Sequence, residues 1–365
     1  MASPSTWQPD WVLAPGEVLA GELEDRGISQ SELARRMDRP TKTINEIVNA
    51  KAAITAETAL QLELALGVSA RFWLGLEGAY RERTARTHTM EVLGEHEAWA
   101  QSFPLAAMRQ LGLLDPKGKR GNGEAVASLL SFFGLSNVSA YERLWGDTAV
   151  AWRRSPSFQP SPQALSAWLR WGELLAADID CQPFDRAALE REATALPALS
   201  REEPFSEVID ELRERLAACG VALVLTKELP DTHVSGAARW LSKRKAVLQL
   251  TLRHKRDDHF WFSLMHEIAH LLDPAGGDHV DLDEDDRNGP TALIEARANE
   301  RARNLLLNQN AYEEFLAGAE INTERIRAFA AENCVSPGIV VGRLQRDGHL
   351  APNQLTGLIK RIDWG

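Results

Sequence analysis

One stretch of the chain, residues 221–253, carries short apolar runs of the kind that form β-strands. The runs are VALVLTKEL, SGAARWLS and KAVLQLTLR, and breaks containing Pro, Gly, Ser or Lys separate them. Helical periodicity dominates the sequence on both sides of this stretch. The sequence therefore predicts a multidomain α+β protein in which one small sheet is embedded in a mostly helical chain.

At 365 residues the chain is longer than one ordinary domain, so two or three domains are expected. Residues 1–80 read as several short helices, and residues 81–205 read as a helical connecting region. Residues 206–365 change character, because they contain the predicted strands. These changes of pattern predict three segments with boundaries near residues 80 and 205.

The formal net charge of −11 excludes a nonspecific polycation and requires any nucleic-acid contact to come from a local surface. No apolar run approaches the ~20 residues of a membrane span, and the N-terminus MASPSTWQPDW lacks the features of a secretory signal. Cys181, Cys219 and Cys334 are scattered and odd in number, which argues against a disulfide framework. We expect a cytoplasmic protein that does not contact a membrane.

Two short helices joined by a tight polar turn are expected within residues 29–51. The first, SQSELARRM, begins with Ser29 as its N-cap, and Glu32 completes a capping box. The second, KTINEIVNAK, follows the break DRPT and turns Ile44 and Ile47 inward. This pattern is typical of a helix-turn-helix motif, and a plain helical bundle with polar outer faces is the alternative.

The exposed face of the second helix is small and polar, as a helix that enters a major groove must be. A polar residue at the start of the preceding helix can brace a phosphate. The candidate DNA-contacting residues are Thr41, Lys42, Thr43, Asn45 and Asn49 on the second helix, and Gln30 on the first. Acidic residues outnumber basic ones in residues 1–80, so charge does not support this prediction.

The segment PGEVLAGELEDRGISQSELARRMDRPTKTINEIVNAKAAITAETALQLELALGVSARFWLGLE, residues 15–77, resembles the DNA-binding domain of HigA-type antitoxins. These are members of the Xre group of repressors. The resemblance includes the ITAETALQL helix and the FW-L-L ending, while the turn Asp38-Arg39-Pro40 is less usual. It implies an all-α, lambda-repressor-like fold and binding to operator DNA, usually as a homodimer.

Residues 81–205 contain five tryptophans that lie among apolar helical neighbours, namely Trp99, Trp145, Trp152, Trp168 and Trp171. Such placement predicts packing anchors in a core, and a base-stacking platform is the alternative. The region carries no pattern that points to catalysis.

The stretch FWFSLMHEIAHLL, residues 260–272, predicts a helix that carries His266 and His270 one turn apart on the same face. Zinc bound through two histidines needs such a pair, because both ring nitrogens must reach the ion at ~2.0–2.1 Å. Glu267 lies beside the first histidine, where it can act on a water next to the metal. This spacing is the H-E-x-x-H pattern of zinc peptidases.

A catalytic zinc site also needs a third protein ligand. The downstream segment TALIEARANERARNLLL predicts a second helix with Glu295 and Asn299 one turn apart, and the intervening loop is long enough to reverse the chain. Glu295 can complete a His2Glu ligand set, and Asn299 can orient a ligand histidine through its other N–H. In the alternative reading, both are surface residues of an amphipathic helix and the histidine motif occurs by chance.

The segments GAARWLSKRKAVLQLTLRHKRDDHFWFSLMHEIAHLL and EARANERARNLLL, with SPGIVVGRLQRDG near the C-terminus, resemble the ImmA/IrrE metallopeptidases, particularly those fused behind an Xre domain. The resemblance implies a zincin-like α+β domain with a small sheet, a zinc cofactor, and cleavage of a partner repressor. By position it implies His266, His270 and Glu295 as ligands and Glu267 as the catalytic base.

Two further features concern the surroundings of this motif. A developing oxyanion needs a donor, and Arg343 and His349 are the candidates, with a solvated turn as the alternative for His349. The sequence departs from the family pattern at Arg301 and Asn308, which lie outside the expected ligand shell.

The combined pattern predicts a DNA-binding transcriptional regulator with a zinc-dependent endopeptidase domain. Its expected substrate is a repressor or another partner protein in a stress, phage or toxin–antitoxin response. The alternative is a HigA-like antitoxin or repressor, with a toxin partner, whose zincin domain is a non-catalytic sensor or structural element.

Overall fold

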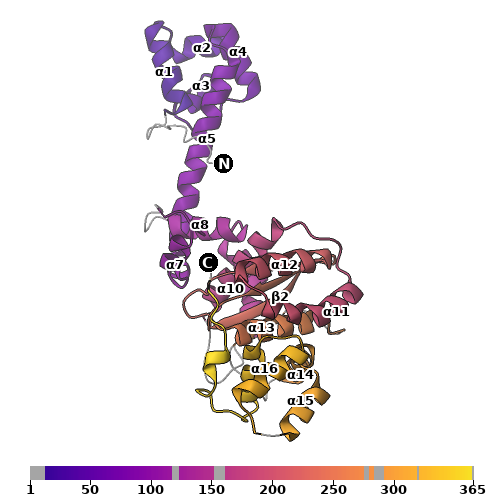
Figure 1. Cartoon of the computed structure of the whole chain (residues 1–365). Coiled ribbons are helices and arrows are strands. Elements are labelled where there is room, and N and C mark those ends of the chain that lie inside the picture. The colour runs from indigo at the N-terminus through magenta and orange to yellow at the C-terminus, as the bar shows by residue number, and fades with distance from the viewer. Residues whose placement is uncertain are drawn as a thin grey trace. The chain divides into compact units, whose positions relative to one another are not determined.

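The computed structural model describes residues 13–116, 123–151, 161–274, 279–282, 292–318 and 320–363 (Figure 1). The chain separates into two compact units, one from Met1–Glu97 and Lys119–Ala127 and the other from Ala98–Gly118 and Ser128–Gly365. The predicted connecting region thus contributes residues to both units. None of the described helices combines the length and the apolar character that crossing a membrane requires.

The first unit contains a succession of short helices followed by a long one. They are α1 (Pro15–Asp25), α2 (Gln30–Arg36), α3 (Thr41–Val48), α4 (Ala56–Leu66) and α5 (Ala70–Gly94). Three of them begin where a side-chain oxygen accepts a backbone N–H of the first turn, at Ser29, Thr55 and Ser69. The helical N-terminal segment is therefore confirmed.

Each of these five helices contributes one fully buried side chain to a common core, namely Leu19, Leu33, Ile44, Leu62 and Trp73. The periodicity of the sequence predicts this inward face, because apolar residues recur once per turn.

Glycine allows α1 to approach α3 closely. A Cβ atom at Gly16 would lie only 2.3 Å from the backbone oxygens of Ile47 and Val48. Residue 16 therefore has to lack a side chain for the two helices to pack at this distance.

The remaining helices are α6 (Glu97–Gln101), α7 (Leu105–Gln110), α8 (Glu124–Phe133), α9 (Val138–Ala151), α10 (Pro162–Ala177), α11 (Arg186–Ala195), α12 (Phe205–Ala218), α13 (Asp257–Leu271), α14 (Ala292–Leu306), α15 (Gln309–Ala317), α16 (Thr323–Glu332) and α17 (Pro337–Arg346). Two 3-10 helices, η1 (Leu196–Arg201) and η2 (Thr356–Leu358), complete the described helical elements. Trp168 and Trp145 are buried as predicted, while Trp152 lies outside the described residues.

Among the described residues, four strands form one sheet in the order β1-β3-β2-β4. They are β1 (Val221–Leu225), β2 (Val234–Ser242), β3 (Lys245–Leu250) and β4 (His279–Leu282). β3 runs parallel to β1 and antiparallel to β2. β4 pairs antiparallel with β2 at the edge. The three predicted strands are present, but β4 lies in a stretch expected to be a loop, so that expectation is wrong at residues 279–282.

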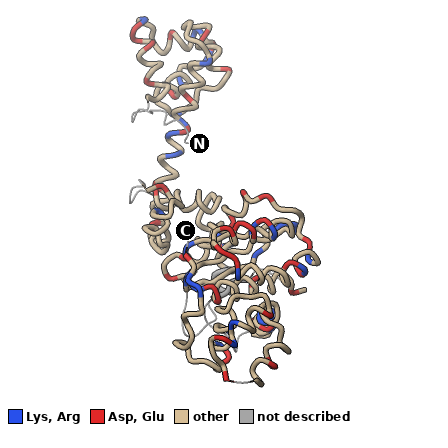
Figure 2. The backbone as a smooth tube through the Cα atoms, viewed as in Figure 1, with Lys and Arg blue, Asp and Glu red and all other residues tan. Residues whose placement is uncertain are grey.

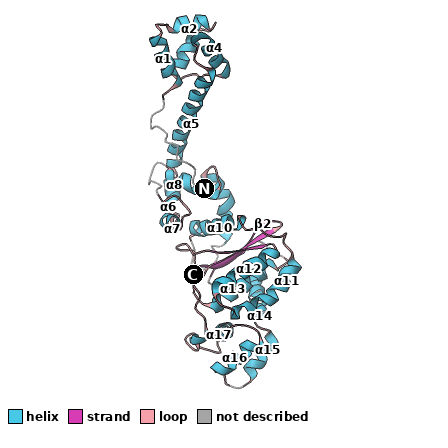
Figure 3. Ribbon diagram, turned by 45° about the horizontal axis from the view of Figure 1, so that its top comes forward, coloured by secondary structure: helices cyan, strands magenta, loops and turns pink. Residues whose placement is uncertain are grey.

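Both faces of the sheet are covered, which explains why its strands are apolar without strict alternation. Ala222, Val224 and Val247 pack with Ala176 of α10 on one face. Their sequence neighbours, including Leu223 and Leu248, pack with α12 and α13 on the other face (Figure 3). The helix that carries the histidine pair therefore lies directly on the sheet.

α17 crosses the beginning of α13 at two glycines. A Cβ atom at Gly338 would lie 2.5 Å from Asp257 Oδ1, and one at Gly342 would lie 2.6 Å from Asp258 Oδ2. Ser336 at the start of α17 donates its hydroxyl proton to Asp257 Oδ2 at 2.7 Å. The start of the histidine helix is thus fixed by α17.

Candidate functional site

The turn between α2 and α3 spans residues 37–40 and has the short polar form expected of a helix-turn-helix motif. Asp38 adopts a positive φ of 49°, which aspartate tolerates better than most residues. Pro40 then precedes α3 with φ −59°. Arg39 turns away from α3 and contacts α4, where its Nε donates to Gln61 Oε1 at 2.6 Å.

The six candidate DNA-contacting residues differ in exposure. Thr41, Lys42 and Asn45 are exposed on α3 and Asn49 is exposed at its C-cap, while Thr43 and Gln30 are half-buried. Asn45 Nδ2 donates to Gln30 Oε1 at 3.2 Å, so a side chain from α2 lies against the exposed face of α3. The assignment of these residues as DNA contacts stays a prediction.

The cations near this surface are engaged by neighbouring acidic residues. Lys42 lies 3.8 Å from Glu46 on α3, and Arg36 lies 3.0 Å from Glu32 on α2. The helices of the first unit accordingly carry both signs of charge (Figure 2). Glu32 does not complete the predicted capping box, because its carboxylate pairs with Arg35 and Arg36.

The second candidate site begins with α13, where the predicted histidine pair is buried. Phe260, Trp261 and Leu264 face the core, so the helix is held firmly. His266 and His270 bring their Nε2 atoms within 3.0 Å of each other. The i and i+4 spacing therefore produces the expected common orientation.

Glu295 reaches this pair from α14. Its Oε2 lies 3.4 Å from His266 Nε2 and 3.7 Å from His270 Nε2. Within the described parts of the chain, these three residues form a group whose ligand atoms all lie within 4.8 Å of one another. Two imidazoles and one carboxylate thus converge from two packed helices.

The charge state of the site suits metal ligation. Burial lowers the pKa of His270, and the neighbouring His266 acts in the same direction, whereas Glu295 raises it. An imidazole kept neutral by burial retains the lone pair that a metal ligand needs.

Glu267 is fully buried against the sheet. A Cβ atom at Gly236 on β2 would lie 2.9 Å from both Cγ and Oε1 of Glu267. The strand therefore has to lack a side chain where the glutamate passes. Gly236 was not among the predicted site residues, although a lone glycine within a strand pattern signals a close approach.

Ionic and hydrogen-bonding contacts, which no sequence motif predicted, fix the end of α13 relative to its neighbours. Arg186 of α11 donates to the carbonyl oxygen of Leu272 at 3.0 Å. Asp273, just after α13, accepts from Arg297 of α14 at 3.0 Å. The second of these contacts joins the end of α13 to α14, the helix that carries Glu295.

The other predicted residues lie as follows. Arg343 is held by Asp347 at 2.5 Å and lies over the ring of Tyr312, whereas His349 is exposed after α17. Asn299 is half-buried on α14, and no hydrogen bond joins its side chain to either histidine among the described residues. The structure does not bring these three residues to the histidine pair by any described contact.

The two departures from the family pattern have structural roles. Arg301 pairs with Glu190 and so connects α14 with α11. Asn308 caps α15 by accepting the backbone N–H of Ala311 at 3.2 Å. Both residues support helix packing beside the site.

Comparisons with known proteins concern the first unit. Residues 21–73 match the model of a helix-turn-helix family. YddM, an uncharacterized HTH-type transcriptional regulator of Escherichia coli, is 33% identical over 66 residues, which are 18% of this chain and 70% of that protein. Virulence-associated protein A of Dichelobacter nodosus is 40% identical over 67 residues, 18% of this chain and 66% of that protein.

Two solved structures are similar over the same part of the chain. An addiction module antidote protein of the HigA family from Coxiella burnetii has 39% identity and a TM-score of 0.20, with 20% of this chain and 80% of that chain covered. Antitoxin GraA has 36% identity and a TM-score of 0.21, with 22% of this chain and 90% of that chain covered.

The first unit therefore contains a DNA-binding helix-turn-helix domain. Through it the chain belongs to the helix-turn-helix family. The matched segment spans about two thirds of the curated relatives.

Proposed function

We propose that the protein is a transcriptional regulator that binds operator DNA through α3 and carries a zinc-dependent endopeptidase in its second unit. Operator binding draws support from the exposed polar face of α3 and from the relative described as an HTH-type transcriptional regulator. Two copies of the motif would contact two half-sites about one helical turn apart on the DNA, so a homodimer is part of the proposal.

The observation that carries the endopeptidase proposal is the convergence of His266, His270 and Glu295. A tetrahedral ion with ligands at ~2.0–2.1 Å has ligand-to-ligand distances of roughly 3.3–3.4 Å. The distances between the three ligand atoms are 3.0, 3.4 and 3.7 Å. The donor set therefore fits zinc in chemistry and in spacing, with a fourth position for a solvent molecule.

The residues of the chain have distinct roles in the proposed reaction. A bound zinc ion supplies Lewis acidity, which polarises a peptide carbonyl and acidifies a water. Glu267 takes the proton of the attacking water and passes it to the leaving amine. Gly236 positions Glu267, because only an unsubstituted strand leaves room for its side chain. The substrate would be a repressor-like or other partner protein.

Glu267→Gln tests the proposal most directly, because the amide keeps the shape of the side chain but cannot act as a base. We expect zinc content and DNA binding equal to wild type, with the zinc-dependent cleavage of a fluorogenic peptide library reduced by at least about a hundredfold. Equal cleavage by the variant would contradict a role for Glu267. Glu300→Ala, an exposed glutamate on α14, serves as the control.

A second candidate function has its own support. Relatives of the first unit are described as an antidote protein and an antitoxin. In this candidate, the protein is an antitoxin that binds a toxin, and the second unit is a sensor or a structural element. Two results together would favour this second candidate. The Glu267→Gln variant would repress transcription and neutralise a toxin as the wild type does, and the wild type would not cleave peptides.

A further inference from the structure

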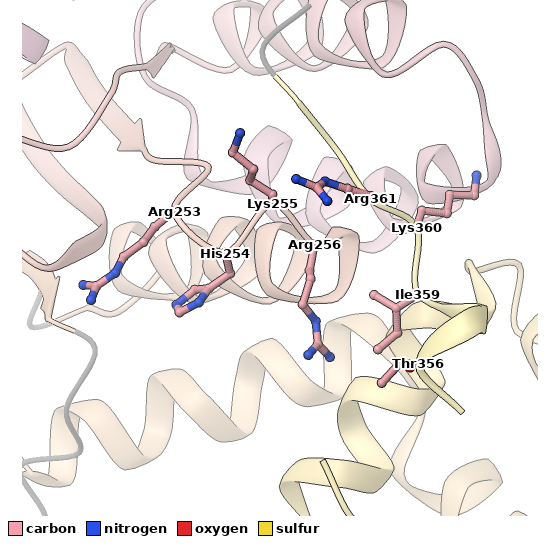
Figure 4. Close-up of a pocket in the computed structure, with 8 residues that line it drawn as sticks. All are labelled: Arg253, His254, Lys255, Arg256, Thr356, Ile359, Lys360 and Arg361. Atoms are coloured by element: carbon pink, nitrogen blue, oxygen red, sulfur yellow. The ribbon is translucent and has the colours of Figure 1, made fainter. Parts of the chain in front are cut away.

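A pocket in the second unit is lined by basic residues from two segments that are far apart in the sequence. One wall is the connection from β3 to α13, and the other is formed by η2 and the segment that follows it. The lining residues are Arg253, His254, Lys255, Arg256, Thr356, Ile359, Lys360 and Arg361 (Figure 4). The pocket volume of about 360 Å³ lies in the range of ~300–1,000 Å³ that small-molecule sites occupy.

Backbone hydrogen bonds hold the two walls together. The N–H of Asp257 donates to the carbonyl oxygen of Lys360 at 3.0 Å, and the N–H of Ile362 donates to that of Lys255 at 3.1 Å. Lys360 also donates its own N–H to Asp257 Oδ1 at 3.0 Å. The basic side chains therefore line a pocket whose main chain is fixed by the fold.

Two cations of this pocket are engaged by other side chains, because Arg256 donates to Asp258 Oδ2 at 2.7 Å and Arg253 lies 3.6 Å from Glu228. The two lysines and Arg361 are more open to an incoming anion. Lys255 lies 3.2 Å from Asp363, and Lys360 lies 3.0 Å from Glu203, but these carboxylates are 62% and 72% exposed. Exposed ion pairs contribute little, so an anion can replace them at small cost. Arg361 is exposed and has no ion-pair partner among the described residues.

The shape of the pocket favours a particular ligand class. Lys255 lies next to the segment of Arg361 along the backbone, because the N–H of Ile362 donates to the carbonyl oxygen of Lys255 at 3.1 Å. Both residues line the pocket together with the less polar Thr356 and Ile359 (Figure 4). Phosphate groups are bound by Arg and Lys side chains. A base or sugar fits against an apolar end such as Ile359. In a chain of net charge −11, this concentration of cations is not a general surface property.

We propose that this pocket binds a phosphate-bearing anion of nucleotide size, with its phosphates at Lys255 and Arg361. The site is separate from the histidine pair. At a rise of ~1.5 Å per residue, His266 lies roughly 14 Å further along α13 than Asp257. The proposal does not depend on the endopeptidase proposal. A ligand here would bridge the approach to α13 and the C-terminal segment.

Isothermal titration of ADP into the full-length protein at low salt tests this proposal. We expect saturable binding by the wild type and at least about tenfold weaker binding by the double variant Lys255→Gln/Arg361→Gln. The control is Arg327→Gln, an exposed arginine on α16, which we expect to bind ADP as the wild type does. Pyrophosphate should compete for the site, and adenosine should not bind measurably.

A second variant separates this site from the proposed metal centre. His270→Ala should keep the affinity for ADP, because the pocket does not contain this residue. Loss of binding in a folded His270→Ala protein would assign the nucleotide to the histidine site and overturn the proposal. Equal affinity in the Lys255/Arg361 double variant, or no saturable binding of ADP to the wild type, would also overturn it.

Discussion

Replacing Gly236 by alanine tests the contact between the sheet and the helix that carries the histidine pair. The added Cβ would lie 2.8 Å from Leu250 Cδ2 and 2.9 Å from Glu267 Oε1. Carbon contacts are ordinarily ~3.5–4.0 Å, so these neighbours must retreat by roughly 0.6–1.2 Å. Both side chains are buried, which leaves them little room.

The structure sets the size of the expected effect. Overpacking of this kind costs about 1–3 kcal/mol, which lowers the melting temperature by roughly 2–12 °C in a domain of this size. The backbone of the three proposed ligands is untouched, so zinc content should stay near that of the wild type. Peptide cleavage should fall by about a hundredfold, because a displacement of ~1 Å misaligns the base.

Thermal unfolding, metal analysis and peptide cleavage on the full-length protein measure these effects. Gly146→Ala on α9 is the matched control, because a Cβ at residue 146 meets no atom within 4 Å. The control should be more stable than the wild type by ~0.5–1 kcal/mol. If the Gly236→Ala protein has the melting temperature and the peptide-cleavage rate of the wild type, the close contact between Gly236 and Glu267 is refuted.

Three further outcomes are expected. Gly16→Ala should destabilise the first unit by about 1–3 kcal/mol in thermal unfolding, because its Cβ meets backbone oxygens of α3, whereas Gly21→Ala on the same helix meets nothing and should be stabilising. If both variants melt alike, the close packing of α1 on α3 is wrong. Lys42→Ala should weaken operator binding similarly for all sequences and reduce the salt-dependence slope by about one, measured by fluorescence anisotropy; an unchanged slope would remove Lys42 from the phosphate contacts. Burial raises the pKa of Asp257 from its ordinary 3.8 to about 6, against the hydrogen bond from the neighbouring serine. The folded state then binds more protons than the unfolded state between these values, so its stability falls as pH rises from about 4 to 6. Asp257→Asn should reduce this fall, which is on the order of 3 kcal/mol at most, in urea unfolding at several pH values. A pH dependence equal to that of the wild type would exclude Asp257 as its source.

Local signals predicted the helices of the first unit well. Ser29 and Thr55 cap their helices as such residues do, since capping depends only on the adjacent turn. The role of Glu32 was predicted wrongly, because two arginines on the same helix attract its carboxylate more strongly than the N-cap amide does. A capping-box motif does not show that other side chains on the same helix compete for the glutamate carboxylate.

The sheet was predicted in part. β1, β2 and β3 have apolar runs, whereas the apolar residues of β4 are only Val280 and Leu282, which alternate with His279 and Asp281. Edge strands commonly carry charged residues, which oppose pairing with another chain, and the pairing of β4 with β2 arises from tertiary structure. Hydrophobic pattern alone therefore could not identify β4.

The histidine pair could be predicted because helical spacing alone sets the relation of His266 to His270. The approach of Glu295 to the histidines depends on how α13 and α14 pack, and a long connection separates these two helices in the sequence. The length of this connection allows the approach but does not specify it. The contacts of Gly236 with Glu267 and of Arg186 with the end of α13 join distant segments. No local signal in the sequence specifies which residues meet in this way.

Metal analysis of the purified protein decides whether His266, His270 and Glu295 hold a metal ion. We expect about one zinc per chain for the wild type and for the Glu300→Ala control. We expect a loss of most of the zinc in His266→Ala and in Glu295→Ala, with both variants still folded by circular dichroism. Zinc content that is unchanged in both of these variants would contradict the claim that their side chains hold a metal ion.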